Sequence, residues 1–365
     1  MTQAGTEFMN ALVSAGAAVH ARGGPVITTL DVFRACLRAR RDVHVDLGPD
    51  PSESPPGSHL AQSSPIGEDW WGRIEALAAL REAAWLAAGD RPWTDRLPWD
   101  AQSRPAVEDA IDMGAERGVF GASGAHLLTA LIAPFDGAVP AALRAAGVSV
   151  DSLAETLEAS GALDLNSVPW TPTFDMLALR AGLAVTPWPL RPLAALYRTA
   201  VRPAVGWVGY GLLHEARRQA VRLGHPTTNP VHLLVAAADL AEQFDTAYAV
   251  GPLARSTHPR PELLEAVRPG HRLIAGLEQP FAHLAVNLGD GGGPPAAEQP
   301  PIRRDGPPFT AAAVAAIDRA LRGPLAPEPG RLDAAPLVAA VLAEPDDAVT
   351  ALLAARGLDP SELST

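Results

Sequence analysis

Two histidines, His126 and His232, have the clearest potential for chemistry, because each stands in a His-Leu-Leu motif near the start of a predicted helix. An imidazole in such a place can bind a metal ion or transfer a proton near neutral pH. No carboxylate or cysteine recurs beside both histidines, so a half-buried structural role is favoured over a role as ligand or proton donor. The chemical role remains the alternative.

Other catalytic candidates lack the partners they would need. His214-Glu215 resembles a zinc-peptidase helix, but Arg218 stands where the second metal ligand belongs. Ser123 lies in Gly-Ala-Ser-Gly-Ala, which misses the last glycine of a nucleophile elbow, so we expect it to cap a helix. Cys36 lies on the apolar face of a predicted helix and is expected in the core. We therefore predict a protein that is not an enzyme, with no catalytic, metal-binding or cofactor-binding residue.

Tryptophan is unusually frequent, with eight residues against three tyrosines. Trp93 and Trp99 each follow a proline in a segment between predicted helices. We expect such indoles to pack the connecting segments onto the helices. The alternative is an aromatic surface pocket for a hydrophobic peptide, because tryptophan is enriched at binding hot spots.

The elements that carry these residues follow one repeated pattern. A capping residue is followed by two apolar residues four and five places later and by an alanine seven places later, which indicates a helix start. The four copies begin at Thr28, Ser123, Asn229 and Asp333. A glycine stands five residues before the first three caps, where it can end a preceding helix. The repeats predict an all-α fold built from tandem degenerate helical repeats.

Two copies share more than the cap. The sequence Leu-Gly-His at 223–225 precedes Val-His-Leu-Leu at 231–234, and Ala-His-Leu-Leu occupies 125–128. With these motifs the chain resembles the N-terminal repeat domain (Clp N or Clp R domain) of the Clp-type AAA+ unfoldases, whose repeats carry a Leu-Gly-His turn and then Gly-Thr-Glu-His-Leu-Leu. Phe309-Thr310 is similar to the opening Phe-Thr of the family. The resemblance implies two double-repeat domains in which His126, His225, His232 and Phe309 have structural or binding roles.

The chain also departs from that family. All 29 basic residues are arginine, so no phosphate-binding Gly-x-x-x-x-Gly-Lys-Ser/Thr loop of an ATPase is present. Ala125 and Val231 replace the acidic residue that the family uses to grip arginine-phosphorylated substrates. The resemblance therefore implies a stand-alone protein- or peptide-binding module that acts as adaptor, regulator or decoy of a Clp chaperone–protease system. Its partners would be Clp unfoldase or protease subunits or their client peptides.

Two other functions stay open. A small-molecule sequestering or sensing protein would share the repeat fold and bind a hydrophobic ligand such as a peptide antibiotic. A small hydrolase is less favoured, because no motif supplies even two members of a catalytic set with suitable spacing.

Composition limits the partners and the compartment. A net charge of −12 argues against nucleic acid, and the nearest basic cluster, Arg38, Arg40 and Arg41, is expected to solvate a helix end. The single cysteine forms no intrachain disulfide, which favours the cytoplasm. Neither a basic leader nor an apolar run of about 20 residues is found, so we expect no membrane association.

The expected organisation is two helical domains joined by a proline-rich connector. The first spans residues 1–165 and carries a flexible insertion at 48–67 that is rich in proline, serine and glycine. The connector covers 166–203, with one short helical stretch at 174–181. The second spans 204–365, with a helix near 262–277 and a flexible linker at 289–308.

Overall fold

The computed structural model describes residues 2–40, 71–89, 91–134, 136–165, 167–181, 204–249, 267, 293–300, 306–326, 330–356 and 359. This part of the chain is mostly helical, which confirms the predicted all-α class. It divides into two compact units, unit 1 (Met1–Trp170) and unit 2 (Thr171–Thr365). None of the described helices is both long enough and apolar enough to cross a membrane.

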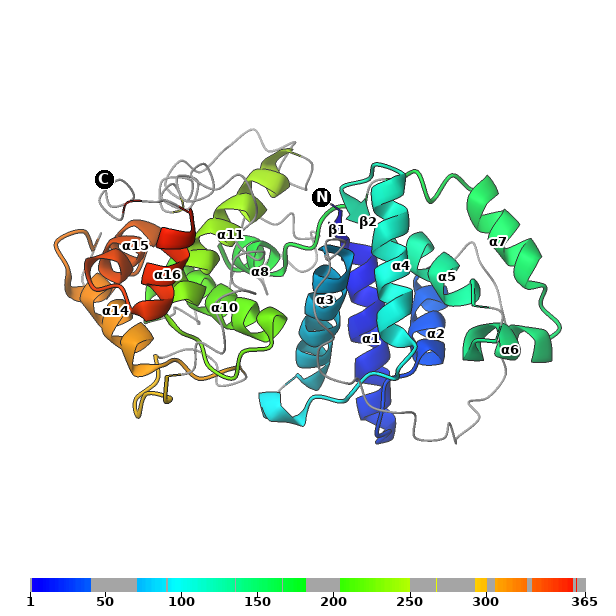
Figure 1. The fold of residues 1–365 in the computed structure, drawn as a ribbon, viewed down its shortest axis with the longest axis horizontal. Helices are drawn as coiled ribbons and strands as arrows, with labels where there is room; N and C mark the ends of the chain where they lie inside the picture. Colours follow the sequence, from blue (N-terminus) through cyan, green and yellow to red (C-terminus); the bar gives the residue numbers. More distant parts are fainter. Residues whose placement is uncertain are drawn as a thin grey trace, which may run out of the picture. The chain divides into compact units, whose positions relative to one another are not determined.

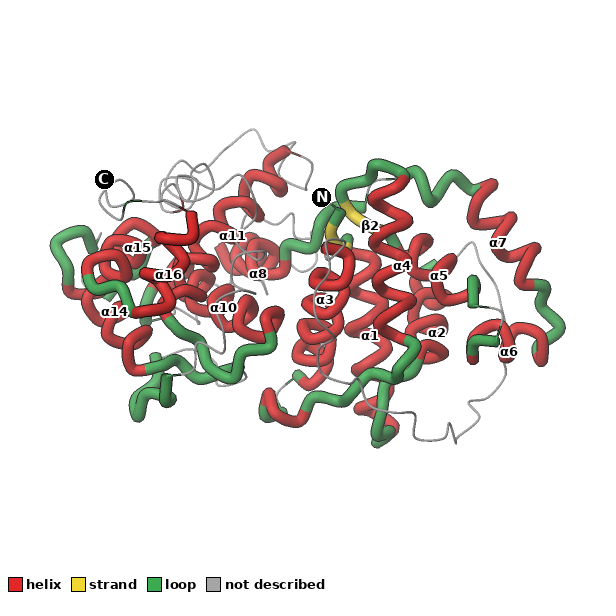
Figure 2. The backbone as a smooth tube through the Cα atoms, viewed as in Figure 1, coloured by secondary structure: helices red, strands yellow, loops and turns green. Residues whose placement is uncertain are grey.

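Unit 1 is built around α1, with α2 and α3 packed against it (Figures 1 and 2). α4 packs against α3 and α5, and the large side chains Phe8, Leu12, Phe33 and Leu127 are fully buried between these helices. The helices are α1 (Thr6–Arg22), α2 (Thr29–Ala39), α3 (Trp71–Ala88), the 3-10 turn η1 (Trp93–Asp95), α4 (Ser103–Glu116), α5 (Gly124–Ile132), α6 (Ala138–Ala145) and α7 (Val150–Ala159). β1 (Gln3–Ala4) and β2 (Gly121–Ala122) form a short parallel ladder.

Unit 2 has its core between α10 and α11, which lie along one another. α14 packs on α15, and α11 contacts α8, α15 and α16. Phe174 of α8 meets Phe244 of α11 edge to face, with ring centroids 5.0 Å apart. The described helices are α8 (Pro172–Ala181), α10 (Gly206–Leu223), α11 (Pro230–Ala249), α14 (Ala311–Arg322), α15 (Ala334–Ala343) and α16 (Asp347–Arg356).

The predicted helix starts are present, each after its capping residue. The helix before each of the first three caps ends at a glycine with left-handed backbone, at φ 72° for Gly23, 71° for Gly118 and 77° for Gly224, a conformation that glycine adopts without a steric penalty. The fourth pair differs, because α14 ends at Gly323 with φ −72° and the side chain of Asp333 makes no capping hydrogen bond.

A crossed backbone pairing ties two helix pairs together in each unit. The residue just before each cap bonds to the segment just before the first helix of the other pair. The bonds are Ile27 N to Pro98 O (2.9 Å), Gly5 N to Ala122 O (2.9 Å), Thr228 N to Pro308 O (2.8 Å) and Leu332 N to Val205 O (3.0 Å). The pairing satisfies backbone groups that the turns would otherwise bury without partners.

The structure differs from the predicted organisation in two segments. The helical stretch predicted at 174–181 within the connector is present as α8, but its Phe174 and Leu177 are buried in the core of unit 2, so this segment is not a connector. Residues 293–300, assigned to a linker, include Pro295, which bridges to Thr310, and Gln299, whose side chain bonds the backbone of Phe309. Buried apolar contacts and backbone pairing fix both segments. The insertion at 48–67 and all of 262–277 except residue 267 lie outside the described residues.

Candidate functional site

His126 acts as part of a helix cap. The backbone N–H of Ser123 donates to His126 Nδ1 at 3.0 Å, and the Ser123 hydroxyl lies 2.9 Å from the same nitrogen. The imidazole is fully buried, and burial lowers its pKa. Because Nδ1 accepts the amide proton, the neutral ring carries its own proton on Nε2. The side chain is therefore a capping acceptor, more deeply buried than the sequence analysis expected.

His232 has the same role in unit 2, with one addition. Its Nδ1 accepts the N–H of Asn229 at 2.9 Å, and its Nε2 lies 2.9 Å from Nδ1 of the partly exposed His225. Burial and the neighbouring His225 lower the pKa of His232 to about 3. The structure thus brings together two of the predicted histidines. Among the described residues, no group of three potential metal-ligating side chains forms.

The remaining catalytic candidates are held in structural contacts. Cys36 is buried in the core, and burial raises the pKa of its thiol to about 12, so it is no nucleophile at neutral pH. Glu215 is fully buried and accepts hydrogen bonds from Arg218 (2.8 Å), Gln219 (2.7 Å) and Thr173. Burial raises the pKa of Glu215, but Arg218 and these hydrogen bonds outweigh it and bring the pKa to about 2. The carboxylate stays ionised to join α8 and α10.

The aromatic candidates contribute mainly to the cores. Trp99 is 3% exposed, and its indole donates to the carbonyl of Leu80 at 2.9 Å, so it lines no surface pocket. Trp93 is partly exposed, and the Arg96 guanidinium lies over its ring at 4.9 Å. Phe309 is fully buried beneath Arg217, whose guanidinium carbon is 5.0 Å from the ring centre.

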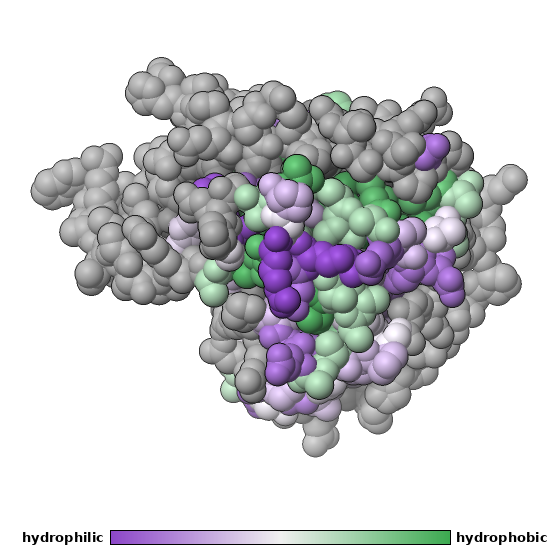
Figure 3. All heavy atoms as spheres, turned by 90° about the vertical axis from the view of Figure 1, so that its left-hand side faces the viewer, coloured by the Kyte–Doolittle hydropathy of each residue, from purple (hydrophilic) through white to green (hydrophobic). Residues whose placement is uncertain are grey.

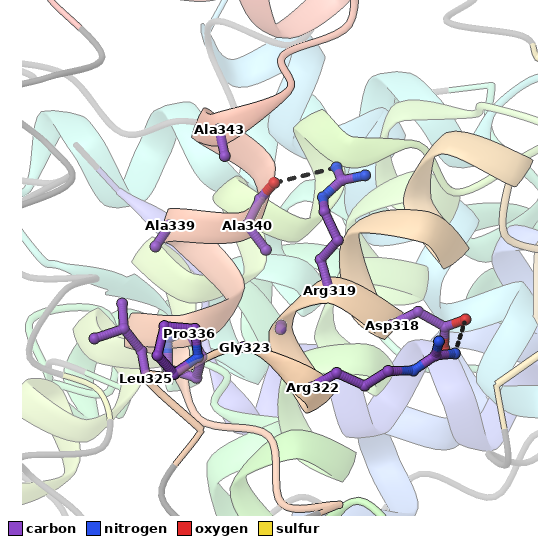
Figure 4. Close-up of a pocket in the computed structure, with 11 residues that line it drawn as sticks. Asp318, Arg319, Arg322, Gly323, Leu325, Pro336, Ala339, Ala340 and Ala343 are labelled. Atoms are coloured by element: carbon purple, nitrogen blue, oxygen red, sulfur yellow. Dashed lines mark hydrogen bonds and ion pairs between the residues drawn. The ribbon is translucent and has the colours of Figure 1, made fainter.

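A groove with a volume of about 490 Å³ lies between α14 and α15 (Figure 4). We call it the α14–α15 groove. Its lining combines small and apolar residues with charged ones at the edge: Asp318, Arg319, Ala320, Arg322, Gly323, Pro324, Leu325, Pro336, Ala339, Ala340 and Ala343. Leu325 is 56% exposed at its mouth. The face of unit 2 in Figure 3 shows a hydrophilic band between hydrophobic surfaces.

Hydrogen bonds and ion pairs hold the groove in shape. Figure 4 shows Arg319 reaching from α14 to the Ala340 carbonyl (3.2 Å) and Arg322 pairing with Asp318 (3.1 Å). Arg319 also pairs with Glu344 at 2.7 Å. These contacts engage the rim charges, so the alanine and proline surfaces remain for apolar contact. Such a groove can take an apolar side chain or a short apolar segment.

This groove was not predicted from the sequence. Its signal is the spacing of Pro336, Ala339, Ala340 and Ala343, which places small side chains three, four and seven residues apart on one face of α15. Small residues facing a neighbouring helix leave space that larger ones would fill.

Comparison of the chain with protein-family models, with curated proteins and with solved structures found no match.

Proposed function

We propose that this protein is a non-catalytic peptide- or protein-binding module whose α14–α15 groove accepts a short apolar segment of its partner. The observation that carries the proposal is the groove itself, with its small apolar lining, the exposed Leu325 at its mouth and rim charges that are already paired. Its volume of about 490 Å³ falls within the range of roughly 300–1,000 Å³ found for ligand sites.

The state of the catalytic candidates supports a binding role over chemistry. His126 and His232 use Nδ1 for helix capping, and the pKa of the Cys36 thiol is raised to about 12. Catalysis by these groups would require breaking the contacts that begin α5 and α11 or opening the core of unit 1.

The finer part of the proposal is that each unit is a Clp-N-like double repeat and that the protein is an adaptor, regulator or decoy of a Clp chaperone–protease system in the cytoplasm. Two helix pairs joined by crossed pairing in each unit are what two repeats per domain would build, and this supports the repeat organisation. The choice of Clp subunits or their client peptides as partners rests on the sequence motifs alone. It is tested by purifying the protein from its host and quantifying Clp subunits among the co-purifying proteins.

Fluorescence anisotropy with a labelled leucine-rich decapeptide tests the groove. Ala343→Glu puts a charge at the exposed end of the groove, and Leu325→Ser removes apolar surface at its mouth. We expect each to weaken binding at least tenfold, because a carboxylate is not readily desolvated and about 2 kcal/mol of apolar contact is lost with a leucine.

Ala335→Glu is the matched control, since Ala335 is an exposed residue of α15 outside the groove. We expect it to bind like the parent chain. Equal losses in all three variants, with unchanged melting temperatures, would reject the groove as the binding site.

The groove volume also suits a small hydrophobic ligand, which keeps the sequestering or sensing function as the second candidate. A hydrophobic peptide antibiotic that binds while the linear decapeptide does not would favour this candidate. The Ala343→Glu variant would then bind the antibiotic more weakly than the parent chain does.

A further inference from the structure

The α14–α15 groove extends along about two turns of helix. Its α15 wall runs from Pro336 to Ala343, a stretch that rises roughly 10 Å along the helix axis. Figure 4 shows Ala343 at one end of the groove and Pro336 and Gly323 at the other. The alanine side chains of this wall are short, so a bound segment can approach closely and place its own side chains between α14 and α15.

The backbone groups that line the groove are largely engaged. α14 and α15 bond their N–H and C=O groups internally, as helices do. The carbonyl of Ala340 also accepts from Arg319 at 3.2 Å, and that of Gly323 accepts the N–H of Ala326 at 3.1 Å. An extended segment on this surface would place its own N–H and C=O groups against alanine and proline side chains, where they lose hydrogen bonds to water. A helix bonds these groups internally and presents only side chains.

The two ends of the groove differ in charge. Arg322, at the end of α14, is 78% exposed, and its partner Asp318 is 51% exposed. Glu344, at the end of α15, is 69% exposed, whereas its partner Arg319 is 32% exposed. The more accessible charge is thus positive at one end and negative at the other. Exposed ion pairs contribute little to stability, so both charges can be shared with a partner of opposite sign.

We propose that the segment bound in the α14–α15 groove is an amphipathic helix of the partner. Its apolar face carries aliphatic side chains three, four and seven residues apart, which about two turns of helix present to one groove. It carries a carboxylate at the end beside Arg322 and a basic side chain at the end beside Glu344. The inference rests on the proposed function of the groove and specifies the conformation and chemistry of what binds there.

Fluorescence anisotropy of the full chain with two labelled peptides tests the inference. Both have about 16 residues, because shorter isolated helices are only marginally stable, and both carry three leucines at helical spacing with glutamate near one end and lysine near the other. In the second peptide, proline replaces a central alanine and disrupts the helix. We expect the second peptide to bind at least tenfold more weakly, because helix formation is part of binding. The circular dichroism of the first should become more helical when it binds.

The variants Ala343→Glu and Ala335→Glu tie this result to the groove. We expect the helical peptide to bind the Ala343→Glu chain at least tenfold more weakly than the parent chain, and the Ala335→Glu chain as tightly as the parent. The melting temperatures of both variants show whether they are folded.

Replacing the lysine of the helical peptide by glutamine tests the charges at the ends of the groove. We expect this peptide to bind about twofold more weakly, as for the loss of an exposed ion pair. An unchanged affinity would reject the basic side chain beside Glu344 as part of the proposal.

The outcomes separate the helical partner from the groove itself. Equal binding of the helical and the proline-containing peptide, with equal losses in Ala343→Glu, would overturn the helical partner and leave the groove as the binding site. Binding that Ala343→Glu does not weaken would reject the proposed function of the groove as well. If neither of these peptides binds, the helical partner is overturned, and the leucine-rich decapeptide decides the proposed function separately.

Discussion

The helix pair α4–α5 in unit 1 and the pair α10–α11 in unit 2 begin their second helix with the same capping contact. They differ in one further contact of the capping histidine. Both pairs turn at a left-handed glycine, and both use a histidine Nδ1 to accept the N–H of the capping residue. The Nε2 of His232 lies 2.9 Å from Nδ1 of His225, whereas among the described residues the backbone of Leu163, and no second histidine, is the further group that acts on the His126 ring. The shared contact is therefore the cap, and the two rings differ in their second neighbour.

The pair α1–α2 extends this comparison. Asp31 takes the place of the histidine, and its carboxylate accepts the Thr28 N–H at 3.0 Å while Arg22 pairs with it at 2.7 Å. The acceptor in this position is an anion in one helix pair and a neutral imidazole in the two others. The position thus requires a hydrogen-bond acceptor, not the proton chemistry of histidine.

The substitution with the largest expected effect disrupts the crossed pairing of unit 1. A Cβ at Gly121 would lie 2.4 Å from the carbonyl oxygen of Ser167, whereas unit 2 has Thr227 at the equivalent place, three residues after the left-handed glycine. We expect Gly121→Ala to lower the free energy of unfolding by about 3 kcal/mol, because backbone must move to admit the methyl group. Urea denaturation measures the change.

Gly124→Ala is the matched control for that substitution. A Cβ there would have its nearest neighbour at an ordinary 3.8 Å, and alanine favours the helix. Stability should therefore stay the same or rise by up to about 1 kcal/mol. A loss equal to that of Gly121→Ala would show that the close approach of Ser167 is not the cause.

The local elements of the fold were predictable, and the crossed pairing was not. The spacing of the caps placed the starts of α2, α5, α11 and α15, because capping and hydrophobic periodicity are encoded within a few residues. The bridge between Ile27 and Trp99 joins residues far apart in sequence and leaves no periodic signal. Trp99 therefore looked like a connector residue, although it packs in the core.

The candidate sites were predicted less well for the same reason. The α14–α15 groove depends on how two helices face one another, and its lining joins residues 318–325 to residues 336–343. Adjacency in the chain is a poor guide where tertiary packing assembles the lining of a site.

A second prediction uses pH to compare the two buried histidines. The pKa of His126 is lowered, and that of His232 is about 3, against an ordinary value near 6.5 in the unfolded chain. Each ring is neutral when folded, so its contribution to stability is complete above pH 6.5 and is lost as the pH falls and the unfolded chain takes up protons. Between pH 6.5 and 5 His232 should account for a loss of about 2 kcal/mol, and the lowered pKa of His126 should add a loss in the same direction.

The variant His232→Gln isolates the contribution of His232 to the loss of stability at low pH. Glutamine keeps an acceptor at the third helical position but does not titrate. In urea denaturation between pH 6.5 and 5, the free energy of unfolding of the variant should fall by about 2 kcal/mol less than that of the parent chain. An unchanged slope would mean that His232 is not neutral in the folded protein.

The prediction with the smallest expected effect compares a cap whose side chain makes a capping hydrogen bond with the fourth cap, whose side chain makes none. Ser123 accepts the Ala125 N–H at 3.2 Å, whereas Asp333 makes no capping hydrogen bond. Ser123→Ala should therefore lower the free energy of unfolding by about 1 kcal/mol and Asp333→Ala by only a few tenths, as measured by thermal denaturation. Equal losses would make Asp333 a functional cap in solution, and the long turn between α14 and α15 would then be no exception to the pattern of the other three pairs.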